Sequence, residues 1–132
     1  MPDVPLIGPV SAPELHVMTF NIRRRMMHLT RRSPDRWHNR KALLRRILRS
    51  EKPTVLGIQE AMPDQMTYVA ESLPESYLSI GYGRNPDMSG ERCAIFYDRD
   101  RLQLGEWSQL ALSDTPDVPG SRSWGNMIPR VV

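Results

Sequence analysis

The sequence predicts an α/β fold in which two helices cover one face of a single mixed sheet. Two apolar stretches, residues 15–21 (LHVMTFN) and 55–60 (VLGIQE), indicate buried strands, and a helical pattern separates them. A strand, a helix and a strand in this order most often form a right-handed βαβ unit with parallel strands. The carboxyl ends of both strands then meet at one sheet edge, where ligands bind in layered α/β folds.

The first strand is predicted over 15–22, with apolar side chains on both faces, which is typical of a strand covered on both sides. A helix is expected from a cap at Ser33, with Pro34 and Asp35 in its first turn, to about residue 50. Its predicted buried stripe is Trp37, Leu43, Leu44, Ile47 and Leu48. A second helix is predicted from Pro63 to about residue 73, with the stripe Met66, Val69, Ala70 and Leu73.

The second half of the chain predicts shorter strands and long loops. Strands are expected over 77–82 and 91–97, followed by a tight turn and a hairpin partner over 102–112 that is broken at Gly105. Residues 113–126, rich in Pro, Gly and Ser, predict a loop. Residues 128–132 resemble the start of another strand.

Composition is that of an ordinary globular domain. The 132 residues are 39% hydrophobic and 25% charged, and no apolar run is long enough to cross a bilayer. Residues 1–14 contain four prolines and lack an early basic cluster, so they predict a flexible leader before a domain at 15–132. The single cysteine, Cys93, excludes an internal disulfide, and these features together predict a cytoplasmic protein without stable membrane insertion.

Positive charge is concentrated in residues 23–52, which hold twelve of the eighteen lysines and arginines. Such a block is either a solvated helix face or a surface that attracts phosphates. Residues 23–25 directly follow the first strand and are therefore better placed than the helix to meet an anionic substrate.

Polar residues end both predicted strands. Asn21 closes the first and Glu60 closes the second. A carboxylate delivered to that edge by an apolar strand indicates a site for a hard metal ion, which prefers oxygen ligands.

Four segments resemble the endonuclease/exonuclease/phosphatase superfamily, the deoxyribonuclease I-like metal-dependent phosphoesterases. They are MTFNIR (18–23), IQEAMPDQ (58–65), SGERCAIFYDRDRL (89–102) and LSDTPDVPGSRSWGNMIPRV (112–131). The resemblance implies a four-layer α/β sandwich, of which this chain is the N-terminal half. It also implies hydrolysis of a phosphate ester with Mg²⁺ or Mn²⁺, the ester lying in nucleic acid, a phospholipid headgroup or a small metabolite.

The resemblance assigns roles to particular residues. Glu60 corresponds to the metal-binding glutamate, and Asn21 to the asparagine that hydrogen-bonds near the metal and the scissile phosphate. Glu91 corresponds to the glutamate that orients a catalytic histidine. Arg130 is expected to approach a phosphate, as is Arg23 from its position after the first strand.

The family's later motifs, Asn-x-His, Gly-Asp-x-Asn and a terminal Asp-His pair, do not occur here. The general base is therefore expected in a missing C-terminal half, and the chain alone is predicted to be inactive. The alternative is a non-catalytic truncated product that binds anionic partners through residues 23–49.

An exposed inner sheet face is a further expectation, formed by Val17, Ile58 and either Ala94 or Ile95. Losing about 500 Å² of apolar packing there would forfeit about 12 kcal/mol at about 25 cal/mol per Å². Whole domains have stabilities of only about 5–15 kcal/mol. The chain is therefore predicted to be partly molten, to aggregate, or to pair with a second chain that covers this face.

Overall fold

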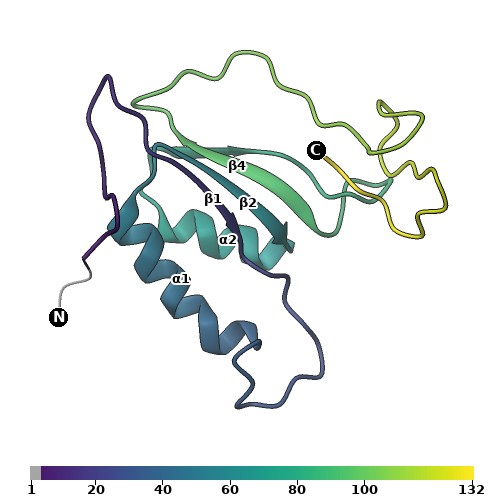
Figure 1. Ribbon diagram of the computed structural model, residues 1–132, viewed down its shortest axis with the longest axis horizontal. Helices are drawn as coiled ribbons and strands as arrows, with labels where there is room; N and C mark the ends of the chain where they lie inside the picture. The colour runs from purple at the N-terminus through teal and green to yellow at the C-terminus, as the bar shows by residue number, and fades with distance from the viewer. Residues whose placement is uncertain (1–3) are drawn as a thin grey trace.

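A computed structural model describes residues 4–132 and shows one sheet with two helices (Figure 1). The elements are β1 (Val17–Asn21), α1 (Trp37–Glu51), β2 (Val55–Ala61), α2 (Pro63–Ser72), β3 (Tyr77–Ile80) and β4 (Arg92–Asp98). Strands follow the order β1-β2-β4-β3, with β1 and β2 parallel and the other neighbours antiparallel. The α/β class, the mixed sheet and the parallel βαβ unit are thus confirmed. Residues 1–3 of the predicted leader lie outside the described residues.

Both helices lie on the same face of the sheet, and that face holds the core (Figure 1). Leu56 pairs in register with Phe96 and Ile58 with Ala94, and all four side chains are at most 3% exposed. The helices contribute Leu44, Leu48 and Val69 to the same cluster. Each such buried side chain contributes about 1.5–3 kcal/mol, so this face accounts for most of the packing.

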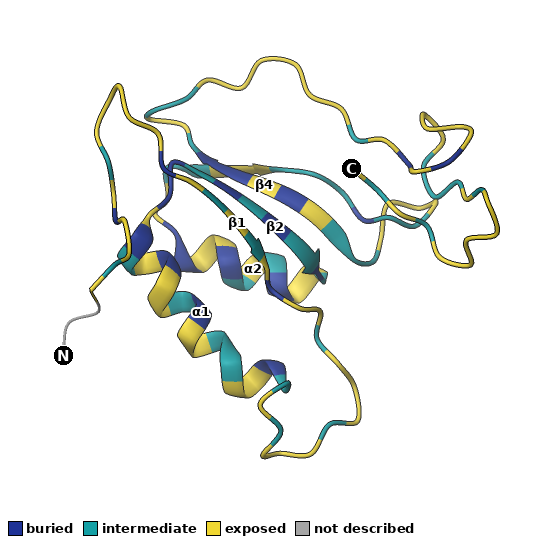
Figure 2. Cartoon of the chain, viewed as in Figure 1, coloured by how far each residue is buried: buried dark blue, intermediate teal, exposed yellow. Residues whose placement is uncertain are grey.

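The opposite face of the sheet is open. Val17 is 66% exposed, Ile95 44% and Leu78 42%, and Figure 2 shows exposed and buried residues alternating along β4. The prediction that the first strand is covered on both sides is therefore wrong for the described chain. The grouping of Ile58 with Val17 is also wrong. Val17 pairs with Val55, three residues before Ile58, so Ile58 faces the helices.

Helix α1 begins at Trp37, four residues after the predicted cap. The Ser33 hydroxyl accepts the Asp35 amide at 3.3 Å and so closes a turn instead of a helix. Leu43 and Ile47, predicted as buried, are 56% and 39% exposed because β1 is the edge strand of the sheet that residues 4–132 form. In α2, Ala70, predicted as part of the apolar stripe, is exposed, whereas Gln65 is buried.

The predicted hairpin partner over 102–112 is absent. Strand β4 already has β2 on one side and β3 on the other, so it has no free edge for a third strand. Only an isolated bridge from Ala111 to Val131 remains of the two strands predicted at 102–112 and 128–132. Residues 113–126 form the expected loop. No helix within residues 4–132 is long and apolar enough to cross a membrane.

Candidate functional site at the carboxyl ends of β1 and β2

Asn21 and Glu60 meet where the two parallel strands end. Asn21 pairs with Gln59 in register, which places Glu60 one residue further along β2. The Asn21 Nδ2 donates to Glu60 Oε1 at 3.0 Å. The predicted meeting of these side chains at one edge of the sheet is therefore confirmed.

The backbone at this edge is strained. Glu60 has φ of 60° and Arg23 has φ of 54°, both in the left-handed region. Such conformations cost a non-glycine residue about 1–2 kcal/mol and cluster at functional sites. The β2–β4 register is also irregular between Ile58 and Ala61. This bulge takes Glu60 out of the ladder, so its side chain is available to Asn21.

Hydrogen bonds and positive charge favour the ionised form of Glu60. Its Oε2 accepts the Arg24 backbone N–H at 3.2 Å, and Asn21 Oδ1 accepts the Arg23 N–H at 2.9 Å. The pKa of Glu60 is lowered chiefly by the Asn21 hydrogen bond, then by the Arg24 N–H and the charges of both arginines, while partial burial opposes them. Glu60 is thus a carboxylate at neutral pH.

Glu91 is joined to this pair through Arg24. Its Oε2 lies 3.4 Å from Arg24 Nη1, and its Oε1 lies 3.2 Å from Arg84 Nη1. The Glu91 side chain is only 14% exposed. The charge on Glu91 is therefore balanced by two arginines. The backbone N–H of one of them, Arg24, also donates to Glu60.

Arg130 lies apart from these residues. Its side chain is exposed, and its carbonyl oxygen accepts the Leu112 N–H at 2.8 Å. No hydrogen bond or ion pair in residues 4–132 links it to Asn21, Glu60 or Glu91. A phosphate contact by Arg130 stays a prediction.

Residues 23–25 are partly neutralised within the molecule. Arg23 pairs with Asp35 at 3.0 Å and Arg25 with Asp64 at 3.0 Å, in addition to the Arg24–Glu91 pair. Further along the basic segment, Arg45 pairs with Glu71 and stacks over the Tyr68 ring. These contacts neutralise part of the positive charge that would otherwise attract an anion from outside the molecule.

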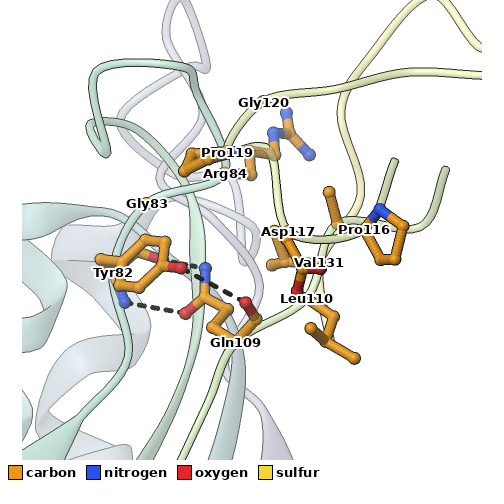
Figure 3. A pocket seen from close by; sticks show the side chains of 11 residues that line it. Tyr82, Gly83, Arg84, Gln109, Leu110, Pro116, Asp117, Pro119, Gly120 and Val131 are labelled. Carbon is orange, nitrogen blue, oxygen red and sulfur yellow. Dashed lines mark hydrogen bonds between the residues drawn. The ribbon is translucent and has the colours of Figure 1, made fainter. Parts of the chain in front are cut away.

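The long loop 113–126 packs beside the residues that support Glu91. The loop residues Pro116, Asp117, Pro119 and Gly120 and the 82–84 segment line a small pocket that leaves only about 10 Å³ of space (Figure 3). Gln109 closes the pocket because it accepts the Tyr82 N–H at 2.9 Å and donates to the Tyr82 carbonyl at 2.9 Å. The segment that carries Arg84 is therefore held in place.

The oxygen atoms of Glu60 are of the type that binds a hard cation, but one carboxylate supplies fewer ligands than such a cation needs. Each Glu60 oxygen accepts one hydrogen bond, which leaves a lone pair on each. Oxygen donors are what Mg²⁺ prefers, but it needs about six of them. No three His, Cys, Asp or Glu side chains gather into a metal-binding group in the part of the chain that the structure describes.

Sequence reasoning missed the residues that organise the site, Gln65, Arg40 and Arg84. A Gln at the third position of a helix is a known capping signal, but by itself that signal marks Gln65 only as a local cap. Arg40 and Arg84 carry no signal beyond their charge.

Comparison with known proteins identifies the class. The chain matches the Endonuclease/Exonuclease/phosphatase family over residues 18–125. That match spans most of the chain, so this protein belongs to the family. No curated protein matches it significantly.

Solved structures with this fold agree. A mannosyl-6-phosphatase of Bacteroides thetaiotaomicron is 33% identical, with a TM-score of 0.79, over 89% of this chain and 43% of that chain. A family protein from the same organism is also 33% identical, with a TM-score of 0.78, over 89% and 41%. One from Bacteroides vulgatus is 25% identical, with a TM-score of 0.77, over 89% and 44%. The chain thus spans less than half the length of these structures.

Proposed function

We propose that this chain supplies part of the active site of a phosphoesterase that depends on a divalent cation, Mg²⁺ or Mn²⁺. The observation that carries the proposal is the Asn21–Glu60 pair, 3.0 Å apart at the ends of two parallel strands, in a chain of this family. The similarity to a mannosyl-6-phosphatase makes a sugar phosphate the first substrate to test, ahead of nucleic acid and phospholipid headgroups.

Each residue of the site has its own proposed role. The ionised Glu60 carboxylate would hold the cation through its remaining lone pairs. A bound cation would stabilise negative charge on the phosphoryl oxygens. Asn21 holds Glu60 in place and can donate to a phosphate oxygen. Glu91 holds the Arg24 guanidinium, and Arg23 adds positive charge where the phosphate would sit.

Hydrolysis also needs a base to take a proton from the attacking water. Glu60 and Asn21 are engaged in other roles, and His16 is buried before the start of β1, bonded to the Gly8 carbonyl. We therefore expect the isolated chain to be inactive and a longer protein that contains it to be active.

Cation binding by the isolated chain tests the metal role directly. Isothermal titration with Mn²⁺ should show weak binding that falls at least about tenfold in Glu60→Gln, because the charge is lost while the shape is kept. Glu106→Gln, at an exposed position outside the site, is the matched control and should bind as the parent does. Equal binding by the parent and Glu60→Gln would remove Glu60 from the site.

Activity is tested in a protein that carries both this chain and the region that matches the rest of its relatives. Release of phosphate from mannose 6-phosphate, and of nitrophenol from bis-p-nitrophenyl phosphate, separates monoester from diester substrates. Glu60→Gln should abolish whichever activity is found, and chelation of the cation should do the same. Activity that persists in both cases would refute a metal-dependent mechanism.

A second chain covering the open sheet face is part of this proposal. Cys93 and Ile95 lie on that face, beside a hollow of about 310 Å³. If copies of the chain associate there, the Cys93 thiol should react more slowly with a disulfide reagent as protein concentration rises. Ile95→Lys should restore the rate, whereas Leu104→Lys, at an exposed loop position, should not. A rate independent of concentration would exclude self-association through this face.

A further inference from the structure

We propose that Gln65 and Arg40 are positioning residues of this site, which together fix the backbone of residues 22–25 so that the Arg24 amide is held on the Glu60 carboxylate. This inference deepens the proposed function, and the part of its test that measures cation binding rests on that function. It begins from two polar side chains whose hydrogen bonds converge on one short segment from opposite sides.

Gln65 holds the segment from α2. Its side chain is fully buried and uses both ends of its amide. Its Oε1 accepts the Arg25 N–H at 3.0 Å and the Met62 N–H at 3.1 Å, and its Nε2 donates to the Arg23 carbonyl at 3.0 Å. The turn after Glu60 is thereby fastened to the segment after Asn21. A glutamate at this position would keep the acceptor and lose the donor.

Arg40 holds the same segment from α1. Its guanidinium donates to the carbonyl oxygens of Ile22, Arg23 and Arg24, the last two at 2.6 and 3.3 Å. The guanidinium also lies 5.1 Å from the centre of the buried Trp37 ring, which limits its movement. An arginine is suited to this task because its planar fork presents several donors in fixed directions.

The segment needs both anchors because its backbone is strained. Arg23 has φ of 54°, and the backbone of a non-glycine residue in this conformation relaxes unless its surroundings hold it. With the Arg23 and Arg25 ends pinned, the Arg24 N–H between them reaches Glu60 Oε2 at 3.2 Å. Loss of either anchor should therefore free the Arg24 amide before it disturbs the helices.

Gln65 and Arg40 together form a clamp on the backbone of residues 22–25. Hydrogen exchange measured by NMR tests this clamp without any ligand. In Gln65→Glu, the Arg24 amide should exchange about tenfold faster, since the hydrogen bond to the Arg23 carbonyl is lost and a buried charge is added. Gln103→Glu is the control, because it adds the same charge at an exposed loop position outside the site. It should leave the Arg24 and Arg25 amides unchanged. Unchanged exchange in Gln65→Glu would overturn the proposal.

Arg40→Lys keeps the test decisive if Gln65→Glu fails to fold. Lysine keeps the charge but has all its donors on one nitrogen, so it cannot reproduce the planar fork that spans the three carbonyl groups. The Arg24 amide should again exchange about tenfold faster, while amides in the middle of α1 stay protected. Exchange at the parent rate would overturn the role of Arg40. Faster exchange throughout the chain would also overturn it, because that result shows a general structural role.

The functional arm measures Mn²⁺ affinity in the same variants. Both should bind at least about threefold more weakly than the parent, because Glu60 is no longer oriented. Gln103→Glu should bind as the parent does. Full affinity in a variant whose Arg24 amide is freed would show that the clamp does not serve the site. If the parent itself binds no Mn²⁺, the proposed function fails, whereas the exchange results still decide the clamp.

Discussion

The two ends of β2 are each flanked by a glutamate, and the two glutamates are used in opposite ways. Before the strand, Glu51 is 4% exposed and accepts three backbone N–H groups, those of Leu6, Ile7 and Gly8 at 2.6, 3.1 and 2.9 Å. Near the end of the strand, Glu60 is less buried and accepts two hydrogen bonds, one of them from a side chain.

The difference separates a structural carboxylate from a candidate ligand. Glu51 is enclosed by main-chain donors from the segment before β1, and it fastens that segment to the end of α1. Glu60 sits on a strained, bulged backbone, and each of its oxygens accepts only one hydrogen bond. A low pKa is common to both carboxyls, so ionisation alone does not identify a site. What sets Glu60 apart is the further lone pair that each of its oxygens keeps.

The largest expected effect is at Glu51. Glu51→Ala should lower the free energy of unfolding by about 2–3 kcal/mol, because three main-chain donors lose a charged acceptor. Urea denaturation followed by circular dichroism measures the change, with the exposed Glu75→Ala as control, expected within about 0.5 kcal/mol of the parent. A loss at Glu51 as small as that at Glu75 would mean that the contacts of the N-terminal segment contribute little.

Acid should weaken both ends of β2, because the pKa of each glutamate is lowered in the folded chain. The pKa of Glu51 is lowered chiefly by the Gly8 N–H, so folding favours its ionised form. Its contribution is complete above the unfolded pKa of about 4.3 and is lost as pH falls through the lower folded value. Stability should therefore decline below about pH 4.3, with a shallower decline in Glu51→Gln. Parallel pH profiles for the parent and Glu51→Gln would contradict this assignment.

Local pattern was enough to predict the elements that set up the site. The apolar runs before Asn21 and Glu60, with an amphipathic helix between them, already imply two parallel strands ending together. The start of α1 could not be predicted, because Asp35 is engaged by Arg23 and its own turn instead of a helix. The sequence around Ser33 matches a helix cap, but the contact between Asp35 and Arg23, twelve residues earlier, is not visible from that local pattern.

Pairing partners were also beyond local reasoning. An alternating run at 102–112 fits a strand, but whether β4 accepts it depends on β2 and β3, which occupy both its edges. The organising role of Gln65 is hidden for the same reason. Its capping position is visible in the sequence, while its bonds to Arg25 and Arg23 span 40 and 42 residues.

A smaller effect should appear at Glu60 and have an unusual sign. Glycine normally destabilises an ordered position by about 0.5–1 kcal/mol relative to alanine. At φ of 60° the order should reverse, so that Glu60→Gly is more stable than Glu60→Ala by about 1 kcal/mol. Both variants lose the carboxylate, so their difference isolates the backbone. If alanine is the more stable, the strain assigned to this end of β2 is absent.

The smallest effect tests what holds the carboxyl end together. The Arg25–Asp64 pair lies at 3.0 Å, but both side chains are well exposed, at 39% and 49%. Exposed pairs contribute about 0–1 kcal/mol and are screened by salt. Asp64→Asn should therefore change the free energy of unfolding by less than about 0.5 kcal/mol and leave the Arg24 amide protected from exchange. If Asp64→Asn freed that amide as fully as Gln65→Glu, surface charge would be holding residues 22–25 in place, and the buried amide would not be their anchor.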